Sequence, residues 1–385
     1  MSVVRKVRRA PVVAGVVVLV AIAVACEANP PANPPAPAPL PPANDVAAPT
    51  TVPPTTTAAP TTVPPTTAPP TTVAPTSYIT PGERLPLGGC AVFPRNNVFH
   101  ATVTALPTVP QSSTMVAAGG GSAVSVRAGF GANVYDGSRA GQPTNVLDAR
   151  TAATQNMIVS FDQASRSETG PVPWPDNPRF EGWPGRAWDK HLQVLDTSTC
   201  TSWELINVQP PYENYYGALL NRWYTDKIVT ADLSSNTPRA KGMVTAANFS
   251  LLAGLVRYDE VASGSIDHVM TMSLPTVRSG PQVWPAMGSD GKSTDPNTPP
   301  MGSWLRLKSS VDLSRLSPQA KVVARALQVH GVVVGDTGPY ASIDGEPDVR
   351  WNDADLLSLR GLTLSDFEVV DPTPMKVADN SFAIR

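Results

Sequence analysis

The chain has 385 residues, with 29 basic and 31 acidic side chains and a formal net charge of −2. Charged residues make up only 16% of the chain, which also contains 43 prolines and three cysteines. No cluster of basic residues occurs in the body of the chain, and this excludes a nucleic-acid-binding protein that relies on a positive surface.

The first 25 residues predict export. Arg5, Lys6, Arg8 and Arg9 precede an uncharged apolar run over residues 11–25. This run is too short to cross a hydrocarbon core of about 30 Å as a stable helix, so it is typical of a signal peptide (1–25) rather than a permanent anchor.

Two ways of processing this signal remain open. Ala23-Val24-Ala25 is a site for general signal peptidase, which would release a soluble protein. The same residues followed by Cys26 resemble a bacterial lipobox, although Ala23 is a weaker choice there than Leu or Val. We favour lipid attachment at Cys26, which predicts an extracellular, cell-surface lipoprotein with the membrane as a partner.

Residues 26–77 predict a disordered linker. The unit Pro-Thr-Thr-Val-Pro-Pro-Thr-Thr occurs at 49–56 and again at 60–67, without apolar periodicity. Proline-rich chain favours the extended polyproline conformation, at about 3.1 Å per residue, so the tract acts as a spacer.

Residues 78–385 predict a single folded domain. Cys90 and Cys200 are the two cysteines left after Cys26, and in an oxidising compartment we expect them to form a disulfide. Short strand patterns outnumber helical ones and do not alternate regularly with them, which favours a mainly β fold, a β-sandwich or jelly-roll-like domain with a few helices.

The expected elements follow from local patterns. Alternating or β-branched runs predict strands, and a turn at Asp196–Cys200 predicts a hairpin between two of them. Capping and Pro/Gly signals predict two helices, and Thr245–Leu255 is a weaker third candidate. In chain order the expected strands are Met157–Phe161, His191–Leu195, Trp203–Val208, Ile266–Leu274, Trp304–Val311, Gly331–Val334 and Phe367–Val370, and the expected helices begin at Pro318, ending at Gly331, and at Asp353, ending at Arg360.

His191 is the first candidate for catalysis. By strand alternation Asp189 and His191 point the same way, and the adjoining strand of the hairpin offers Glu204. A carboxylate beside an imidazole orients a general base, although the same pair also ties strand ends to loops in proteins without activity. His268 is a weaker candidate for catalysis. It shares a strand face with methionines and an isoleucine, which is typical of an ordinary histidine in the core.

Other motifs are missing or have plainer explanations. No G-x-S-x-G nucleophile motif occurs, and no CxxC or HxxxH pair predicts a metal site, so we expect neither metal nor cofactor. The alternating acids Asp344, Glu346 and Asp348 are typical of a solvated turn more than of a calcium loop. Trp183 and Trp188 are candidates for stacking on sugar rings, because an exposed indole offers an apolar face.

Eight stretches together resemble a family of uncharacterised bacterial secreted proteins, across most of the folded part. These stretches are FPRNN, DKHLQVLD, ADLSSN, GLVRYDEVASGSIDH, VWPA, PPMGSWLRLKSS and DVRWNDADL with SDFEVV. The resemblance implies an extracellular protein with one folding unit and no established reaction. Residues that match the family pattern are His191, Arg257, Asp259, Glu260, His268 and Lys308.

The chain departs from that family at two places. Arg127-Ala128-Gly129 stands where the family has His-Pro-Asp, and Met287-Gly288 stands where it has a basic residue and a histidine. If the missing polar groups serve catalysis, this member only binds its ligand.

Two hypotheses of function remain. The first is an envelope protein that binds or processes extracellular or cell-wall glycan, as a hydrolase or lyase if it is an enzyme. The second is a non-catalytic adhesion or scaffold module. The candidate polar residues are Asp189, His191, Glu204, Arg257, Asp259, Glu260, His268 and Lys308; either Arg257 or Lys308 would balance the charge of the substrate.

Overall fold

The computed structural model describes residues 77–185 and 188–385. The chain divides into Met1–Thr71 and Thr72–Arg385, and the fold below belongs to the second unit. The predicted signal peptide, Cys26 and the linker up to residue 76 lie outside the described residues. Within the described part, no helix combines the length and apolar character required to span a bilayer.

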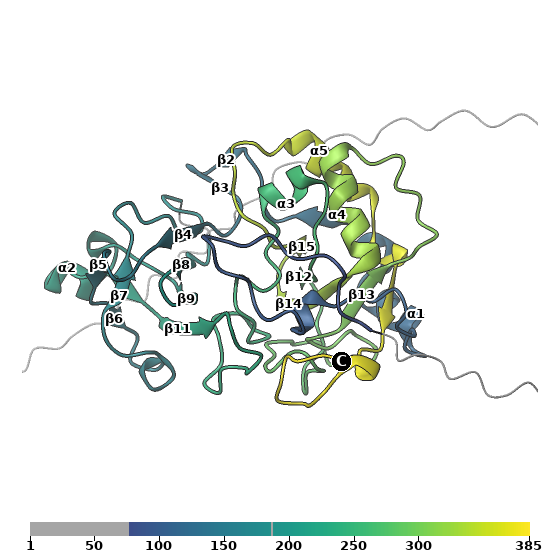
Figure 1. Ribbon diagram of the computed structural model, residues 1–385, viewed down its shortest axis with the longest axis horizontal. Coiled ribbons are helices and arrows are strands. Elements are labelled where there is room, and N and C mark those ends of the chain that lie inside the picture. Colours follow the sequence, from purple (N-terminus) through teal and green to yellow (C-terminus); the bar gives the residue numbers. More distant parts are fainter. Residues whose placement is uncertain (1–76, 186–187) are drawn as a thin grey trace, which may run out of the picture. The chain divides into compact units, whose positions relative to one another are not determined.

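A six-stranded mixed sheet forms the larger half of the fold (Figure 1). Its strand order is β1-β15-β12-β14-β13-β16. The pairs β1/β15 and β12/β14 are parallel and the other pairs are antiparallel. The strands are β1 (Val126–Ala128), β12 (Met270–Leu274), β13 (Trp304–Leu307), β14 (Val332–Thr337), β15 (Ala341–Ile343) and β16 (Phe367–Val370).

A four-stranded sheet of order β11-β9-β8-β4 forms the other half. The predicted hairpin is confirmed, because β8 and β9 pair antiparallel across the Asp196–Cys200 turn. The strands are β4 (Thr144–Leu147), β8 (Leu192–Asp196), β9 (Thr201–Ile206) and β11 (Lys227–Asp232). Three two-stranded pairs complete the β structure: β2 (Val134–Tyr135) with β3 (Ser138–Arg139), β5 (Ala153–Gln155) with β7 (Val172–Trp174), and β6 (Ile158–Val159) with β10 (Tyr224–Thr225).

Helices are few and short, and α4 (Pro318–Val329) is the longest among the described residues. It contacts β13 and α5. As predicted, Pro318 lies in its first turn and Gly331, at φ +69°, follows its end. Ser317 occupies the N-cap position, but its hydroxyl makes no capping hydrogen bond. The remaining helices are α1 (Ser112–Ala118), α2 (Tyr215–Leu220), α3 (Tyr258–Ser263), α5 (Asp353–Leu357) and seven short 3₁₀ turns, η1 (Val98–His100), η2 (Gly121–Ala123), η3 (Ala164–Arg166), η4 (Pro211–Glu213), η5 (Ser358–Gly361), η6 (Leu364–Asp366) and η7 (Thr373–Met375).

Each large sheet has its own apolar core. The larger core packs β12, β13 and β14 against α4, and it includes the fully buried Trp304. The smaller core lies along β8 and β9, around Leu192 and Leu205. The prediction of a mainly β fold with a few helices is confirmed.

The predicted disulfide is also confirmed: Cys90 and Cys200 are bonded, with their Cα atoms 5.5 Å apart. The bond ties the N-terminal segment of the domain to the β8–β9 turn across 110 residues of sequence. A closure of this length limits the unfolded chain and, in the chain-entropy model, stabilises the fold by about 4–5 kcal/mol.

We expect the double substitution Cys90→Ser and Cys200→Ser to lower the free energy of unfolding by up to that amount. Urea unfolding followed by tryptophan fluorescence measures the change. The Cys26→Ser protein keeps the bonded pair and is the matched control. Equal unfolding midpoints for the double variant and the control would contradict this role of the disulfide.

Candidate functional site

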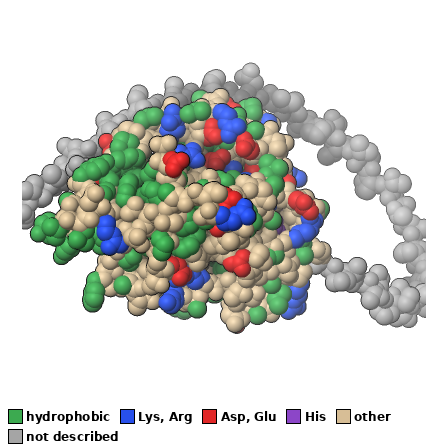
Figure 2. Space-filling model, turned by 60° about the vertical axis from the view of Figure 1, so that its left-hand side comes forward, with side chains coloured by type: hydrophobic (Ala, Val, Ile, Leu, Met, Phe, Trp, Pro, Cys, Tyr) green, Lys and Arg blue, Asp and Glu red, His purple; other side chains and the backbone are tan. Residues whose placement is uncertain are grey.

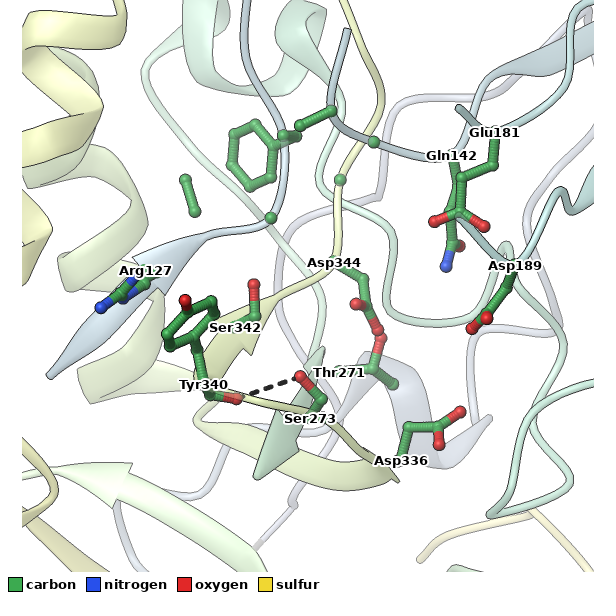
Figure 3. A pocket seen from close by; sticks show the side chains of 18 of the residues that line it. Arg127, Gln142, Glu181, Asp189, Thr271, Ser273, Asp336, Tyr340, Ser342 and Asp344 are labelled. Atoms are coloured by element: carbon green, nitrogen blue, oxygen red, sulfur yellow. Dashed lines mark hydrogen bonds between the residues drawn. The ribbon is translucent and has the colours of Figure 1, made fainter. Parts of the chain in front are cut away.

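A pocket of about 610 Å³ opens where the larger sheet meets the segment that leads into β8. Strands β1, β12, β14 and β15 supply one wall, and Glu181, Asp189 and His191 supply part of the other. Figure 3 shows Glu181 and Asp189 at the right of the pocket, with Asp336 and Asp344 between them and Arg127 at the left. The pocket therefore gathers acids from distant parts of the sequence.

The register of the larger sheet places a polar row on its pocket face. Ser273 of β12 lies opposite Asp336 on one side and opposite Ser342 on the other, and Ser342 in turn lies opposite Arg127. Residues two apart on a strand share a face, so Thr271 and Asp344 belong to the same face, one step along. One face of the sheet thus carries two acids, hydroxyls and one arginine.

A β-bulge directs Asp336 toward this face. Between Met272 and Ser273 the pairing of β12 with β14 shifts by one residue, so that Ser273 lies opposite Asp336 instead of Gly335. Without the shift Asp336 would share the core-facing side of Val332 and Val334, because side chains alternate along a strand.

Burial makes both strand acids weak. Loss of solvent raises the pKa of Asp344 to about 7, with the nearby charges of Asp336 and Glu181 adding to the effect and the Thr271 hydroxyl opposing it. Burial likewise raises the pKa of Asp336 to about 6. Because the two carboxyl groups interact, the raised pKa values belong to the pair, which retains a proton at higher pH than exposed aspartates do.

His191 forms an ion pair on the opposite wall. Its Nδ1 lies 2.7 Å from the Glu181 carboxylate. Burial acts to lower the pKa of His191, but the Glu181 carboxylate outweighs it and raises that pKa to about 9. The ring is therefore cationic at neutral pH. Its buried Nε2 has no hydrogen-bond partner within the described part of the chain.

The predicted partner of His191 needs correction, because Glu181 and not Glu204 bonds to the ring. Glu204 lies opposite Gln193 in the hairpin and is fully buried. It accepts hydrogen bonds from the Ser250 hydroxyl and from the Leu251 backbone amide, and burial raises its pKa to about 7. Since Ser250 and Leu251 line the pocket, Glu204 supports the pocket floor from behind.

Aromatic side chains line the pocket beside the acids. Trp188, Tyr135, Phe130 and Tyr340 all contribute to the lining. Trp183 is absent from it: this ring packs 5.0 Å from Phe180 and belongs to the smaller core. Of the two tryptophans predicted to stack on sugars, Trp188 lies where a ligand in the pocket can reach it.

Three of the remaining candidates, Arg257, Glu260 and His268, form a separate network around α3. Glu260 is buried and bonds to Arg84, Arg257 and His268, at distances between 2.6 and 3.2 Å. Burial and the charge of Arg84 lower the pKa of His268 to about 4, so its ring is neutral at pH 7. None of these side chains lines the described pockets, and their contacts are those of a structural ion cluster.

The last two candidates lie at the surface. Asp259 pairs with Arg350 on the solvent side of α3. Lys308 donates a hydrogen bond from Nζ to the Ser365 carbonyl, 2.6 Å away. Neither residue lines the pocket, so the predicted charge-balancing role of Arg257 or Lys308 has no support in their positions.

The sequence patterns did not predict Asp336 as a site residue, and they placed Asp344 only in an acidic turn. Gly335-Asp336 comes directly after the predicted strand Gly331–Val334. An acid at the end of an apolar strand is the sequence feature that could have identified Asp336 as a site residue. The residues described hold no group of three His, Cys, Asp or Glu side chains arranged to bind a metal ion.

Comparisons with protein-family models, with curated proteins and with solved structures found no match to this chain. The resemblance to a family of secreted proteins stays a prediction.

Proposed function

We propose that this protein is an exported enzyme that hydrolyses extracellular or envelope glycan in the pocket around Asp344 and Asp336. The single observation that carries the proposal is this pair of partly buried carboxyl groups with unequal, raised pKa values on one sheet face. Glycoside hydrolysis requires such a pair, one protonated and one ionised. The aromatic lining suits the apolar faces of sugar rings.

Each acid has a role in this proposal. Asp344 donates its proton to the glycosidic oxygen as the bond to the anomeric carbon breaks. Asp336 acts as the carboxylate partner, and water supplies the hydroxyl group that the anomeric carbon gains. The cationic His191 donates from Nε2 to an oxygen of the sugar, with Glu181 holding its ring in place.

These protonation states favour a hydrolase over a lyase. A lyase of the kind considered from the sequence would use neutral His191 to abstract a proton. The Glu181 carboxylate keeps His191 protonated up to a pKa of about 9, and a protonated ring cannot accept a proton at pH 7.

The same pKa values predict a bell-shaped dependence of kcat/KM on pH. Activity falls above about pH 7, where Asp344 loses its proton, and falls below about pH 6, where Asp336 gains one. Because the two groups interact, the two midpoints belong to the pair. Thr271→Val removes the hydroxyl that favours ionised Asp344, so we expect it to move the alkaline limb to higher pH. An unchanged alkaline limb in that variant would contradict the assignment of Asp344.

The direct test of function is digestion of a glycan panel. Purified protein is incubated with neutral, acidic and amino-sugar polysaccharides, and new reducing ends are measured by a colour assay and by mass spectrometry. We expect reducing ends from at least one polymer with the parent protein and from none with Asp336→Asn. Loss of polymer without reducing ends, with unsaturated products instead, would indicate a lyase and contradict the proposal.

A second function, adhesion without catalysis, is favoured by one surface. Hydrophobic side chains gather on the left of the face that Figure 2 turns forward. Among the exposed apolar residues of the chain are five on η4 and α2, which we call the α2 surface: Tyr212, Tyr215, Tyr216, Leu219 and Leu220. Glycan binding that is lost on Tyr215→Ser and Tyr216→Ser, with no turnover by the parent, would support adhesion.

A further inference from the structure

The pocket has a positive end as well as an acidic one. Arg127 lies on β1 opposite Ser342, and its Cζ lies 3.5 Å from the centre of the Tyr340 ring. In Figure 3 Arg127 and Tyr340 stand together on the left, whereas Asp336, Asp189 and Glu181 stand on the right. Arg127 therefore lies apart from Asp336, Asp189 and Glu181 within the pocket.

Arg127 lacks an internal anion. Other arginines of the fold pair with carboxylates, as Arg306 does with Glu368 and Arg239 with Glu168. For Arg127, residues 77–185 and 188–385 provide no ion pair and no hydrogen bond to the guanidinium, and its buried Nε has no partner. A cation left without a partner, and fixed on an aromatic ring, is available to an anion that enters the pocket.

The planar shape of the Arg127 guanidinium limits which class of anion it binds best. A guanidinium presents two parallel N–H groups that match the two oxygens of a carboxylate, and stacking on Tyr340 fixes the plane in which they point. Arg360 also lines the pocket and adds positive charge near it, again with no ion pair among the described residues. The pocket thus combines sugar-stacking rings, a proton donor and a planar carboxylate receptor.

We propose that Arg127 binds the carboxylate of a uronic acid residue, so that the substrate is an acidic polysaccharide; this inference rests on the hydrolase function proposed above. The glycosidic bond next to that residue then lies toward Asp336 and Asp344. The role of balancing substrate charge, which the sequence assigned to Arg257 or Lys308, passes to Arg127.

Calorimetric titration tests the inference. The probes are tetrasaccharides of galacturonate, glucuronate and mannuronate, each as the free acid and as the methyl ester, together with a sulfated neutral tetrasaccharide. We expect at least one free acid to bind at least 10-fold more tightly than its ester. Arg127→Met should remove that preference and leave binding of the ester unchanged, and Arg127→Lys should restore only part of it.

Arg315→Met is the matched control, because Arg315 is exposed and does not line the pocket. It should bind like the parent. Circular dichroism and the melting temperature establish that each variant is folded. If Arg127→Met does not fold, the inference is tested by comparing the binding of free acid and methyl ester in the parent and in Arg127→Lys. Equal binding of acid and ester by the parent, binding of the sulfated probe alone, or no binding of any acid would overturn the inference.

The two proposals fail separately. Cleavage of a neutral glycan that Arg127→Met leaves unchanged would refute the uronate site and keep the hydrolase. Arg127-dependent binding of an acid probe without cleavage of its parent polymer would support the uronate site and refute the hydrolase.

Discussion

Asp344→Asn will lower kcat on the cleaved glycan by about 10²–10⁴-fold while changing oligosaccharide binding by only a few-fold. The amide has nearly the size of the carboxyl group but cannot donate a proton to the leaving oxygen as an acid does. Initial rates of reducing-end release, with binding measured by calorimetry, separate the two effects. Asp259→Asn, on the exposed side of α3, is the control and should retain parental kcat.

The same substitution should stabilise the fold at alkaline pH. Asp344 has a raised pKa, so the folded state is penalised as pH rises from the ordinary value of 3.8 through about 7, and the penalty is complete above that. We expect Asp344→Asn to gain about 1–2 kcal/mol at pH 8 and nothing at pH 3.5. A variant that keeps parental kcat, or that is less stable than the parent at pH 8, would remove Asp344 from the proposed role.

Glu260→Gln will lower the free energy of unfolding at pH 7 by about 3–5 kcal/mol. Glu260 bonds to Arg84 and Arg257, and all three side chains are buried. A neutral amide leaves two buried guanidinium groups without their anion. Burial acts to raise the pKa of Glu260, but His268, Arg84 and Arg257 hold it well below its usual range.

The contribution of Glu260 to stability changes with pH in the opposite direction to that of Asp344. Its stabilisation is present above the ordinary pKa of 4.5 and is lost as pH falls, so the parent should lose more stability than Glu260→Gln on acidification. Because the stabilisation is lost between pH 4.5 and the much lower pKa of folded Glu260, chemical denaturation at pH 7 and pH 2 measures both values. The control Asp259→Asn, at the residue before Glu260, breaks the exposed ion pair with Arg350 and should lower the free energy of unfolding by less than about 1 kcal/mol. Equal losses in the two variants would show that burial of the cluster contributes nothing.

Local patterns predicted much of the fold. The β8–β9 hairpin, the helix α4 and the mainly β character all depend on short-range alternation, turn residues and Pro/Gly signals, which act within a few residues. The Cys90–Cys200 bond was predicted from the expected oxidising compartment and from the small number of cysteines. The parallel pairs β1/β15 and β12/β14 join segments with no local signal in common, so the sequence pattern did not show them.

Strand alternation does not explain how the site residues come together. Asp189 and His191 both line the pocket, but they precede β8, and Lys190 between them has a φ of +53°, which interrupts an extended strand. Asp336 reaches the pocket through a bulge in a pair of parallel strands, which no single strand reveals. Arg257, Glu260 and His268 were chosen as polar residues that match a family pattern, yet together they form a buried ion cluster away from the pocket. A close spacing of polar residues does not distinguish a site from a structural network.

A crystal structure of Asp344→Asn with an oligosaccharide product of the cleaved glycan tests the central claim most directly. We expect sugar density in the pocket, with a glycosidic oxygen within hydrogen-bond distance of the side chain at position 344 and with His191 Nε2 donating to the ligand. Sugar bound only outside the pocket, for example on the α2 surface or against Trp183, would contradict it.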